Sequence, residues 1–191
     1  MMWLYIATGA TGGMTALFCL YWINLWLSPP PKLEVRFSPK GGCIDMVVRA
    51  IESARHEILM MAYSFTADPI TNALIAAKKR GVTVDLLMDK SNEAESYSDL
   101  HLLLKGGVEP LIDAHHAIAH NKVLMVDGKV LLTGSFNFTN QAEGENAENL
   151  LKVTHHREIL AAYRKDFAAH REHCRKPQAG AVPVEHHRHA A

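Results

Sequence analysis

A strand–turn–strand segment in the last third of the chain does most to restrict the folds that this sequence can adopt. Residues 123–126 (Val-Leu-Met-Val) are apolar without a break, which predicts a buried strand. Asp127-Gly128 is a strong hairpin turn signal, so residues 129–133 are expected to return antiparallel to that strand. The fold must therefore contain a β-sheet that holds this hairpin.

Polar side chains stand at the open end of the hairpin. His120 and Lys122 are two residues apart, so a strand would direct both side chains to the same face. The returning strand ends at Gly134, which would let the backbone approach a ligand closely, and Ser135 and Asn137 follow it. Lysine supplies a point charge, serine and asparagine supply neutral donors, and histidine supplies a nucleophile or proton carrier. This set suits a phosphodiester, whose free oxygens need charge neutralisation and whose bridging oxygens need acid–base help.

The spaced string His-x-Lys-x4-Asp-x6-Gly-Ser-x-Asn, from His120 to Asn137, resembles the HKD signature of the phospholipase D superfamily at every fixed position. Residues 61–66, 76–82 and 134–139 resemble the small, single-motif bacterial endonucleases of that superfamily. The resemblance spans residues 35–173 and implies a phosphodiester hydrolase with the phospholipase D/nuclease fold.

The resemblance also assigns roles to individual residues. Glu148, next to Asn149, falls where these enzymes carry a glutamate that supports the catalytic histidine. Asp127 is a fixed position of the motif, although its place in a turn before Gly128 also accounts for its presence. The candidate residues are accordingly His120, Lys122, Asp127 and Glu148 for catalysis, and Lys122, Ser135 and Asn137 for phosphate binding.

The chain has one complete motif, and its single histidine cannot serve as both the nucleophile and the general acid of the reaction. An imidazole that attacks phosphorus from one side cannot protonate the leaving oxygen on the opposite side, so a second acid must face it. A two-fold symmetric homodimer would supply a second His120 at a shared site on the axis. The family resemblance implies the same pairing of single-motif chains.

The substrate is not decided by composition. The formal net charge is +0, which gives no general attraction to nucleic acid or to an acidic membrane. The likeness to bacterial endonucleases favours DNA or RNA, with a head-group phosphodiester of a glycerophospholipid as the alternative. Lys78, Lys79 and Arg80 are candidates for an extended phosphate-binding face, although a helix end before Gly81 favours cations in any case.

No metal or other cofactor is expected. His116 and His120 are four residues apart, a spacing that binds metal on a helix, but this segment leads into a strand. The sequence shows no carboxylate or cysteine that would complete a site with these two and His115, and the family resemblance implies a metal-independent reaction. The histidines at 186, 187 and 189 are interpreted as an adventitious chelator in a tail.

The N-terminal segment is predicted to be a membrane anchor. No charged residue occurs before Lys32, and Trp3 to Leu27 is mostly apolar. A run of about 25 such residues can cross a bilayer as a helix. The expected location is therefore a bacterial inner membrane with a single pass. An uncleaved anchor or signal segment is favoured over a cleaved signal peptide, because no basic residue stands at the start and residues 23–27 are bulky where cleavage would be expected. A proline linker follows at Ser28–Pro31. Two arguments about the side of the membrane conflict: the basic residues after the span favour the cytoplasm, whereas the resemblance to bacterial endonucleases implies an exported enzyme with a cleaved leader.

Alternating strand and helix patterns predict one α/β domain over residues 32–175, followed by a disordered His-rich tail at 176–191. The expected architecture is a mixed, mostly parallel sheet sandwiched between helices. Asp68-Pro69 and Gly81 bound one predicted helix, residues 68–79, and residues 91–105 are expected to form another.

Overall fold

The computed structural model describes residues 13–23, 29–95 and 97–178, and the chain divides into two compact units at Pro31 and Lys32. In the first unit residues 13–23 are helical. No helix among the described residues combines the length and apolar character needed to cross a membrane. Residues 3–12 and 24–27 of the predicted anchor lie outside the described part of the chain, as do residues 179–191 of the predicted tail.

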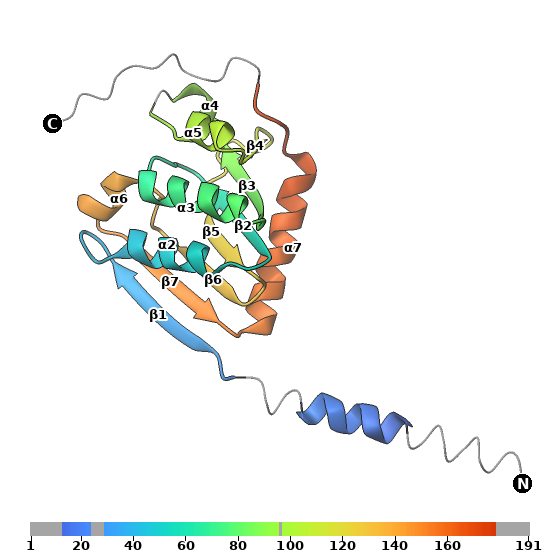
Figure 1. Cartoon of the computed structure of the whole chain (residues 1–191). Helices are drawn as coiled ribbons and strands as arrows, with labels where there is room; N and C mark the ends of the chain where they lie inside the picture. Colours follow the sequence, from blue (N-terminus) through green and yellow to red (C-terminus); the bar gives the residue numbers. More distant parts are fainter. Residues whose placement is uncertain (1–12, 24–28, 96, 179–191) are drawn as a thin grey trace, which may run out of the picture. The chain divides into compact units, whose positions relative to one another are not determined.

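A single mixed sheet forms the centre of the second unit (Figure 1). Its strands lie in the order β1-β7-β6-β5-β2-β3-β4. Their bounds are β1 Lys32–Phe37, β2 Glu57–Ala62, β3 Thr83–Asp89, β4 Leu111–Asp113, β5 Lys122–Val126, β6 Val130–Gly134 and β7 Asn149–Thr154.

Helices cover both faces of this sheet, as predicted. Figure 1 shows α2 and α3 on one face and α7 on the other. The strand side chains alternate between two cores: Leu124 packs with the α2 and α3 residues, whereas Met125 packs with Leu160 and Phe167 of α7. The helices are α2 Cys43–Ser53, α3 Asp68–Lys79, α4 Ser91–Ala94, α5 Leu100–Lys105, α6 Asn140–Gly144 and α7 Arg157–His173.

The prediction of a mostly parallel sheet is wrong for the pairing of the strands. Only β2, β3 and β4 pair in parallel, whereas β2 with β5, β5 with β6, β6 with β7 and β7 with β1 are antiparallel. The reason lies in the connections. Parallel neighbours need a crossover, which α3 provides between β2 and β3, but the turn after β5 is too short for one.

The register of β2 and β5 shows at which end of the strands the predicted site residues lie. Ala62 at the carboxyl end of β2 pairs with Lys122 at the start of β5, so the predicted hairpin opens at the carboxyl edge of the parallel strands. Ile58 pairs with Val126 at the opposite edge. In open α/β sheets ligands bind outside the carboxyl ends of the strands, which is where His120 and Lys122 lie.

Candidate active site

An imidazole, a phenol ring and a buried ammonium group meet at the start of β5. The side chain of Lys122 is 5% exposed, and its Nζ donates a hydrogen bond to the carbonyl of His120 at 2.8 Å. The same Nζ lies 4.8 Å from the centroid of the Tyr63 ring. The Tyr63 ring in turn lies 4.5 Å from the ring of His120, which is exposed to solvent. The nucleophile predicted from the sequence is thus accessible, beside a positive charge largely removed from water.

Burial of Lys122 lowers the pKa of its ammonium group. Desolvation lowers the pKa of its ammonium group from 10.5 to about 8, and the nearby carboxylate of Glu148 opposes this shift only in part. A cation that is poorly solvated gains more from an incoming anion than an exposed one does. The site therefore favours a phosphate group at Lys122.

The segment after β6 lies against the start of β5. Val123 pairs with Thr133, so the antiparallel register brings Gly134 opposite Lys122. Ser135 Oγ accepts hydrogen bonds from the backbone N–H of Asn149 at 3.1 Å and from its Nδ2 at 3.4 Å, which leaves the serine O–H to donate elsewhere.

Gly134 serves a purpose other than the predicted approach to a ligand. A Cβ atom at this position would lie 2.2 Å from the backbone carbonyl oxygen of Asn149. The close approach that excludes a side chain is therefore made by the neighbouring strand β7.

The side chain of Asn137 has an unpaired atom. Its Oδ1 is buried and has no hydrogen-bond partner among the residues that the structure describes. Buried amide atoms without a partner are uncommon and call for an explanation. Because this atom is closed to solvent, an N–H placed there by a half-turn of the carboxamide would not be open to a phosphate oxygen either, and the phosphate-binding role of Asn137 stays a prediction.

Glu148 lies near the ammonium group rather than on the imidazole. Its charge acts on Lys122, and its Oε1 accepts a hydrogen bond from Asn146 Nδ2 at 3.3 Å. Within the described part of one subunit, no hydrogen bond joins Glu148 to the ring of His120. The predicted support of His120 by Glu148 is therefore not formed inside this subunit.

Asp127 does not lie with the other candidates, and the structure corrects its predicted catalytic role. It follows β5 at the sheet edge opposite to Lys122. Its two carboxylate oxygens accept backbone hydrogen bonds from Arg55, His56 and Glu57 at 2.8 to 2.9 Å. Burial raises the pKa of this carboxyl group, but these three N–H groups outweigh it and hold the pKa below its usual value. Asp127 therefore ties the turn to the start of β2.

We expect Asp127→Ala to lower the free energy of unfolding by about 2 to 4 kcal/mol, because three charge-assisted hydrogen bonds are lost and alanine is unfavourable at φ 50°. Asp127→Asn should cost less, since it keeps an acceptor oxygen and tolerates this backbone conformation. Urea unfolding measures both. If kcat fell steeply in folded Asp127→Asn, the structural role would be contradicted.

The basic trio at the end of α3 is also remote from the site. The β2–α3–β3 crossover brings Lys78, Lys79 and Arg80 to the edge where β3 begins, opposite to His120. Arg80 donates hydrogen bonds to the carbonyls of Ile51 and Glu52. These residues therefore do not extend the phosphate-binding face.

Tyr63 is a residue of the site that the motif does not single out. It follows the last residue of β2, and its backbone N–H donates to the carbonyl of Asn121 at 3.1 Å. The signal available in the sequence is its place inside residues 61–66, one of the segments that carry the family resemblance.

The imidazole of His120 and the ammonium group of Lys122 thus lie together at this edge, with the Ser135 hydroxyl on the segment that follows β6. Known proteins resemble the chain over the same region. A family profile described as "Cardiolipin synthase, PLD-like domain" matches residues 47–171. A phospholipase D of Rickettsia bellii is 40% identical over 139 residues, which are 66% of this chain and 69% of that protein.

Two further relatives cover more of the chain. The mitochondrial cardiolipin hydrolase of Mus musculus is 28% identical over 179 residues, which are 78% of this chain and 81% of that protein. The crystal structure of Nuc from Salmonella typhimurium, a phospholipase D family member, has 35% identity and a TM-score of 0.74, and the match covers 78% of this chain and all of that one. The chain belongs to the phospholipase D superfamily and is a hydrolase acting on phosphodiester bonds.

Proposed function

We propose that this protein is an endonuclease without sequence specificity that cleaves DNA or RNA through a phosphohistidine at a site shared by two subunits. The observation that carries the proposal is the exposed ring of His120 beside the buried ammonium group of Lys122. The ring is accessible for attack on phosphorus, and the charge lies where the nonbridging oxygens would bind. Ser135 and Asn137 add neutral donors to the same edge of the sheet.

The reaction needs two imidazoles, and the sequence contains one His-x-Lys motif. In a symmetric dimer, a ring nitrogen of one His120 attacks phosphorus, and a P–N bond forms as the P–O bond to the leaving group breaks. The other His120, protonated, gives its proton to the leaving oxygen. It then takes a proton from water, which attacks phosphorus, breaks the P–N bond and releases the phosphate monoester.

Nucleic acid is the preferred substrate because residues 61–66, 76–82 and 134–139 resemble small bacterial endonucleases of the superfamily. The match to Nuc, over its whole length at 35% identity, agrees with this preference. A phospholipid is the second candidate, since relatives bear the names phospholipase D and mitochondrial cardiolipin hydrolase and the N-terminal segment is predicted to be an anchor. We place the protein in a bacterial inner membrane, held by a single pass of the N-terminal segment.

The substrate can be decided with the purified full-length protein in detergent micelles. We expect it to nick supercoiled plasmid and to cut RNA in the presence of EDTA, because an imidazole and an ammonium group supply what a metal would supply otherwise. His120→Ala should be inactive, and His56→Ala, an exposed histidine at the far edge of the sheet, should be fully active. Release of head groups from phosphatidylcholine or cardiolipin vesicles, without cleavage of nucleic acid, would overturn the nuclease proposal in favour of the lipid.

A further inference from the structure

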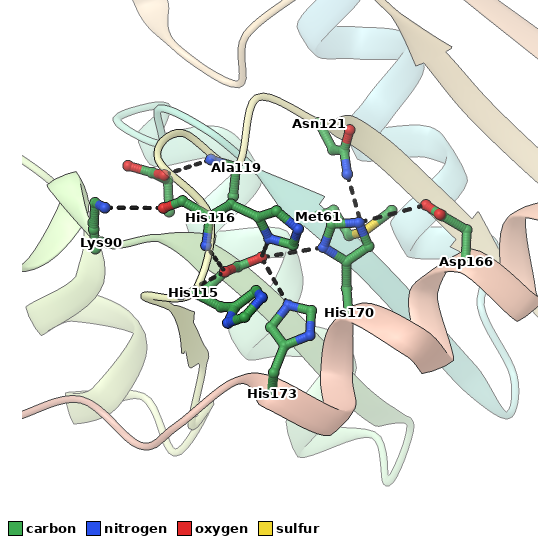
Figure 2. A network of polar contacts seen from close by, with 11 residues as sticks. Met61, Lys90, His115, His116, Ala119, Asn121, Asp166, His170 and His173 are labelled. Carbon is green, nitrogen blue, oxygen red and sulfur yellow. Dashed lines mark hydrogen bonds and ion pairs between the residues drawn. The ribbon is translucent and has the colours of Figure 1, made fainter.

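We propose that Asp113, His116, His170 and His173 form a structural site for a divalent transition-metal ion, with zinc as the preferred occupant. Figure 2 shows the rings of the three histidines pointing toward one another, His116 from a loop and the other two from α7. Each residue offers one ligand atom, and all four atoms lie within 4.8 Å of one another.

The distances suit a tetrahedral ion. Oδ2 of Asp113 lies 2.9 Å from His116 Nδ1, 3.1 Å from His170 Nδ1 and 3.3 Å from His173 Nε2. Zinc binds imidazole nitrogen and carboxylate oxygen at about 2.0–2.2 Å, which puts neighbouring ligands of a tetrahedron about 3.3–3.6 Å apart. Small side-chain rotations would therefore bring all four atoms to bonding distance.

Hydrogen bonding alone does not account for this arrangement. Oδ2 of Asp113 offers two lone pairs, yet three ring nitrogens converge on it. A metal ion removes this conflict because each nitrogen then binds through its lone pair and needs no proton there.

The ligands are held by elements that are themselves fixed. Asp113 is 2% exposed at the end of β4, and its Oδ1 accepts the backbone N–H groups of His115 and His116 at 3.1 and 3.2 Å. His170 and His173 lie one turn apart near the end of α7. Two short-spaced pairs, Asp-x2-His and His-x2-His, come from separate elements and together offer four nitrogen and oxygen ligands, the number that tetrahedral zinc takes.

The surroundings of His170 add an independent observation. While its Nδ1 faces the cluster, its Nε2 lies 3.9 Å from Oδ2 of Asp166, one turn earlier in α7. A metal-bound histidine usually donates its other ring N–H to a carboxylate, a backbone carbonyl or water, which orients the ring and raises its basicity. Asp166 is in a position to take this role, although at 3.9 Å it makes no hydrogen bond. The ligand set of three imidazoles and one carboxylate, without a thiolate, selects zinc, copper or nickel over magnesium and calcium.

Such an ion would fasten α7 to the loop that leads to the catalytic histidine. Residues 114–121 connect β4 with β5 and end at the site. Lys90 donates to the carbonyl of His116 at 2.9 Å, and Ala119 donates its N–H to Asp89 at 2.7 Å (Figure 2). The ion would add a third tether at the start of this loop, without contact with the reacting groups.

From the sequence, His116 and His120 are the candidate pair of metal ligands, and no carboxylate is expected to complete a site with them. The structure corrects both points. His120 faces Tyr63, whereas His116 faces Asp113, three residues before it. A metal ion in this cluster would not take part in the reaction, because the cluster lies at the β4 end of the sheet, beyond β3. The prediction of a metal-independent reaction is therefore unaffected by the proposal.

Metal content tests the proposal directly. The probe is Zn²⁺ alone, added to full-length protein in which the three histidines at 186, 187 and 189 are replaced by alanine, so that the tail cannot chelate. We expect one zinc ion per chain by elemental analysis after dialysis, and a higher Tm in Zn²⁺ than in EDTA. Co²⁺ in place of zinc should give the visible absorption of a tetrahedral site.

Variants of the ligands complete the test. His173→Ala and, separately, His116→Gln should weaken zinc binding at least about 100-fold and remove the zinc-dependent rise in Tm, because loss of a ligand exceeds the 10- to 100-fold effect of an outer partner. His56→Ala should retain both. A protein whose Tm is the same in Zn²⁺ and EDTA, or zinc binding that survives both ligand substitutions, would show a purely hydrogen-bonded cluster and overturn the proposal.

Discussion

An equal mixture of wild-type and His120→Ala subunits is expected to retain about one quarter of the wild-type activity, because only dimers with two intact rings can react. The His120→Ala homodimer itself should lose activity by a factor on the order of 10⁴ or more, as expected when a covalent nucleophile is removed. Random pairing gives one quarter wild-type dimers, one half mixed dimers and one quarter double variants. The mixed dimers would contain either a nucleophile or an acid, but never both.

Co-expression of the two chains at equal levels, followed by purification and a plasmid-nicking assay, measures this fraction. A mixture of wild-type and His56→Ala chains provides the matched control and should retain full activity. Sites that worked independently within each subunit would leave about one half of the activity in the His120→Ala mixture. That outcome, or full turnover by a strictly monomeric form, would contradict a shared site.

The elements that depend on local signals could be predicted closely. The helix expected at residues 68–79 is α3, with the same bounds, because Asp-Pro begins a helix and Gly81 ends one whatever surrounds them. The hairpin of β5 and β6 likewise follows from an apolar run and an Asp-Gly turn. These signals act within a few residues and need no tertiary partner.

Other elements depend on contacts that distant residues make. The helix expected at residues 91–105 is divided into α4 and α5, because Asn92 donates to the carbonyls of Tyr63 and Asp89, and Ser98 donates to Asn92. Side chains that bond the backbone in this way compete with a continuous helix. The short helix α6 was not expected, since its five residues carry no periodic pattern.

In the site too, the positions that depend on one hairpin could be predicted from the sequence, whereas those that depend on tertiary packing could not. The placement of Lys122 and Gly134 follows from the register of one hairpin. The remoteness of Asp127 also follows from local geometry, since the five residues of β5 separate it from Lys122 by about 17 Å. The cluster around Asp113 could not be predicted, because it forms only where α7 packs beside β4.

Replacing Lys122 by methionine is expected to abolish phosphate binding and, at the same time, to stabilise the protein. The side chain is 5% exposed, and burial lowers its pKa from 10.5 to about 8, which means that the fold holds this charge at a cost. At neutral pH the cost corresponds to about 1 to 3 kcal/mol, after allowance for partial solvation and for the contacts with Tyr63 and the His120 carbonyl. Methionine fills a similar volume without charge.

The pH dependence of this effect has a definite sign. Between pH 8 and 10.5 the unfolded chain holds the Lys122 proton and the folded chain releases it, so wild-type stability rises over this window and the difference from Lys122→Met shrinks. For the same reason kcat/KM of the free wild-type enzyme should fall as pH rises through about 8. Urea unfolding at pH 7 and pH 10 measures the first effect, with Lys129→Met, an exposed lysine in the same hairpin, as the control. A Lys122→Met protein less stable than wild type at pH 7 would show that the ammonium group is well solvated, and the electrostatic account of the phosphate site would fail.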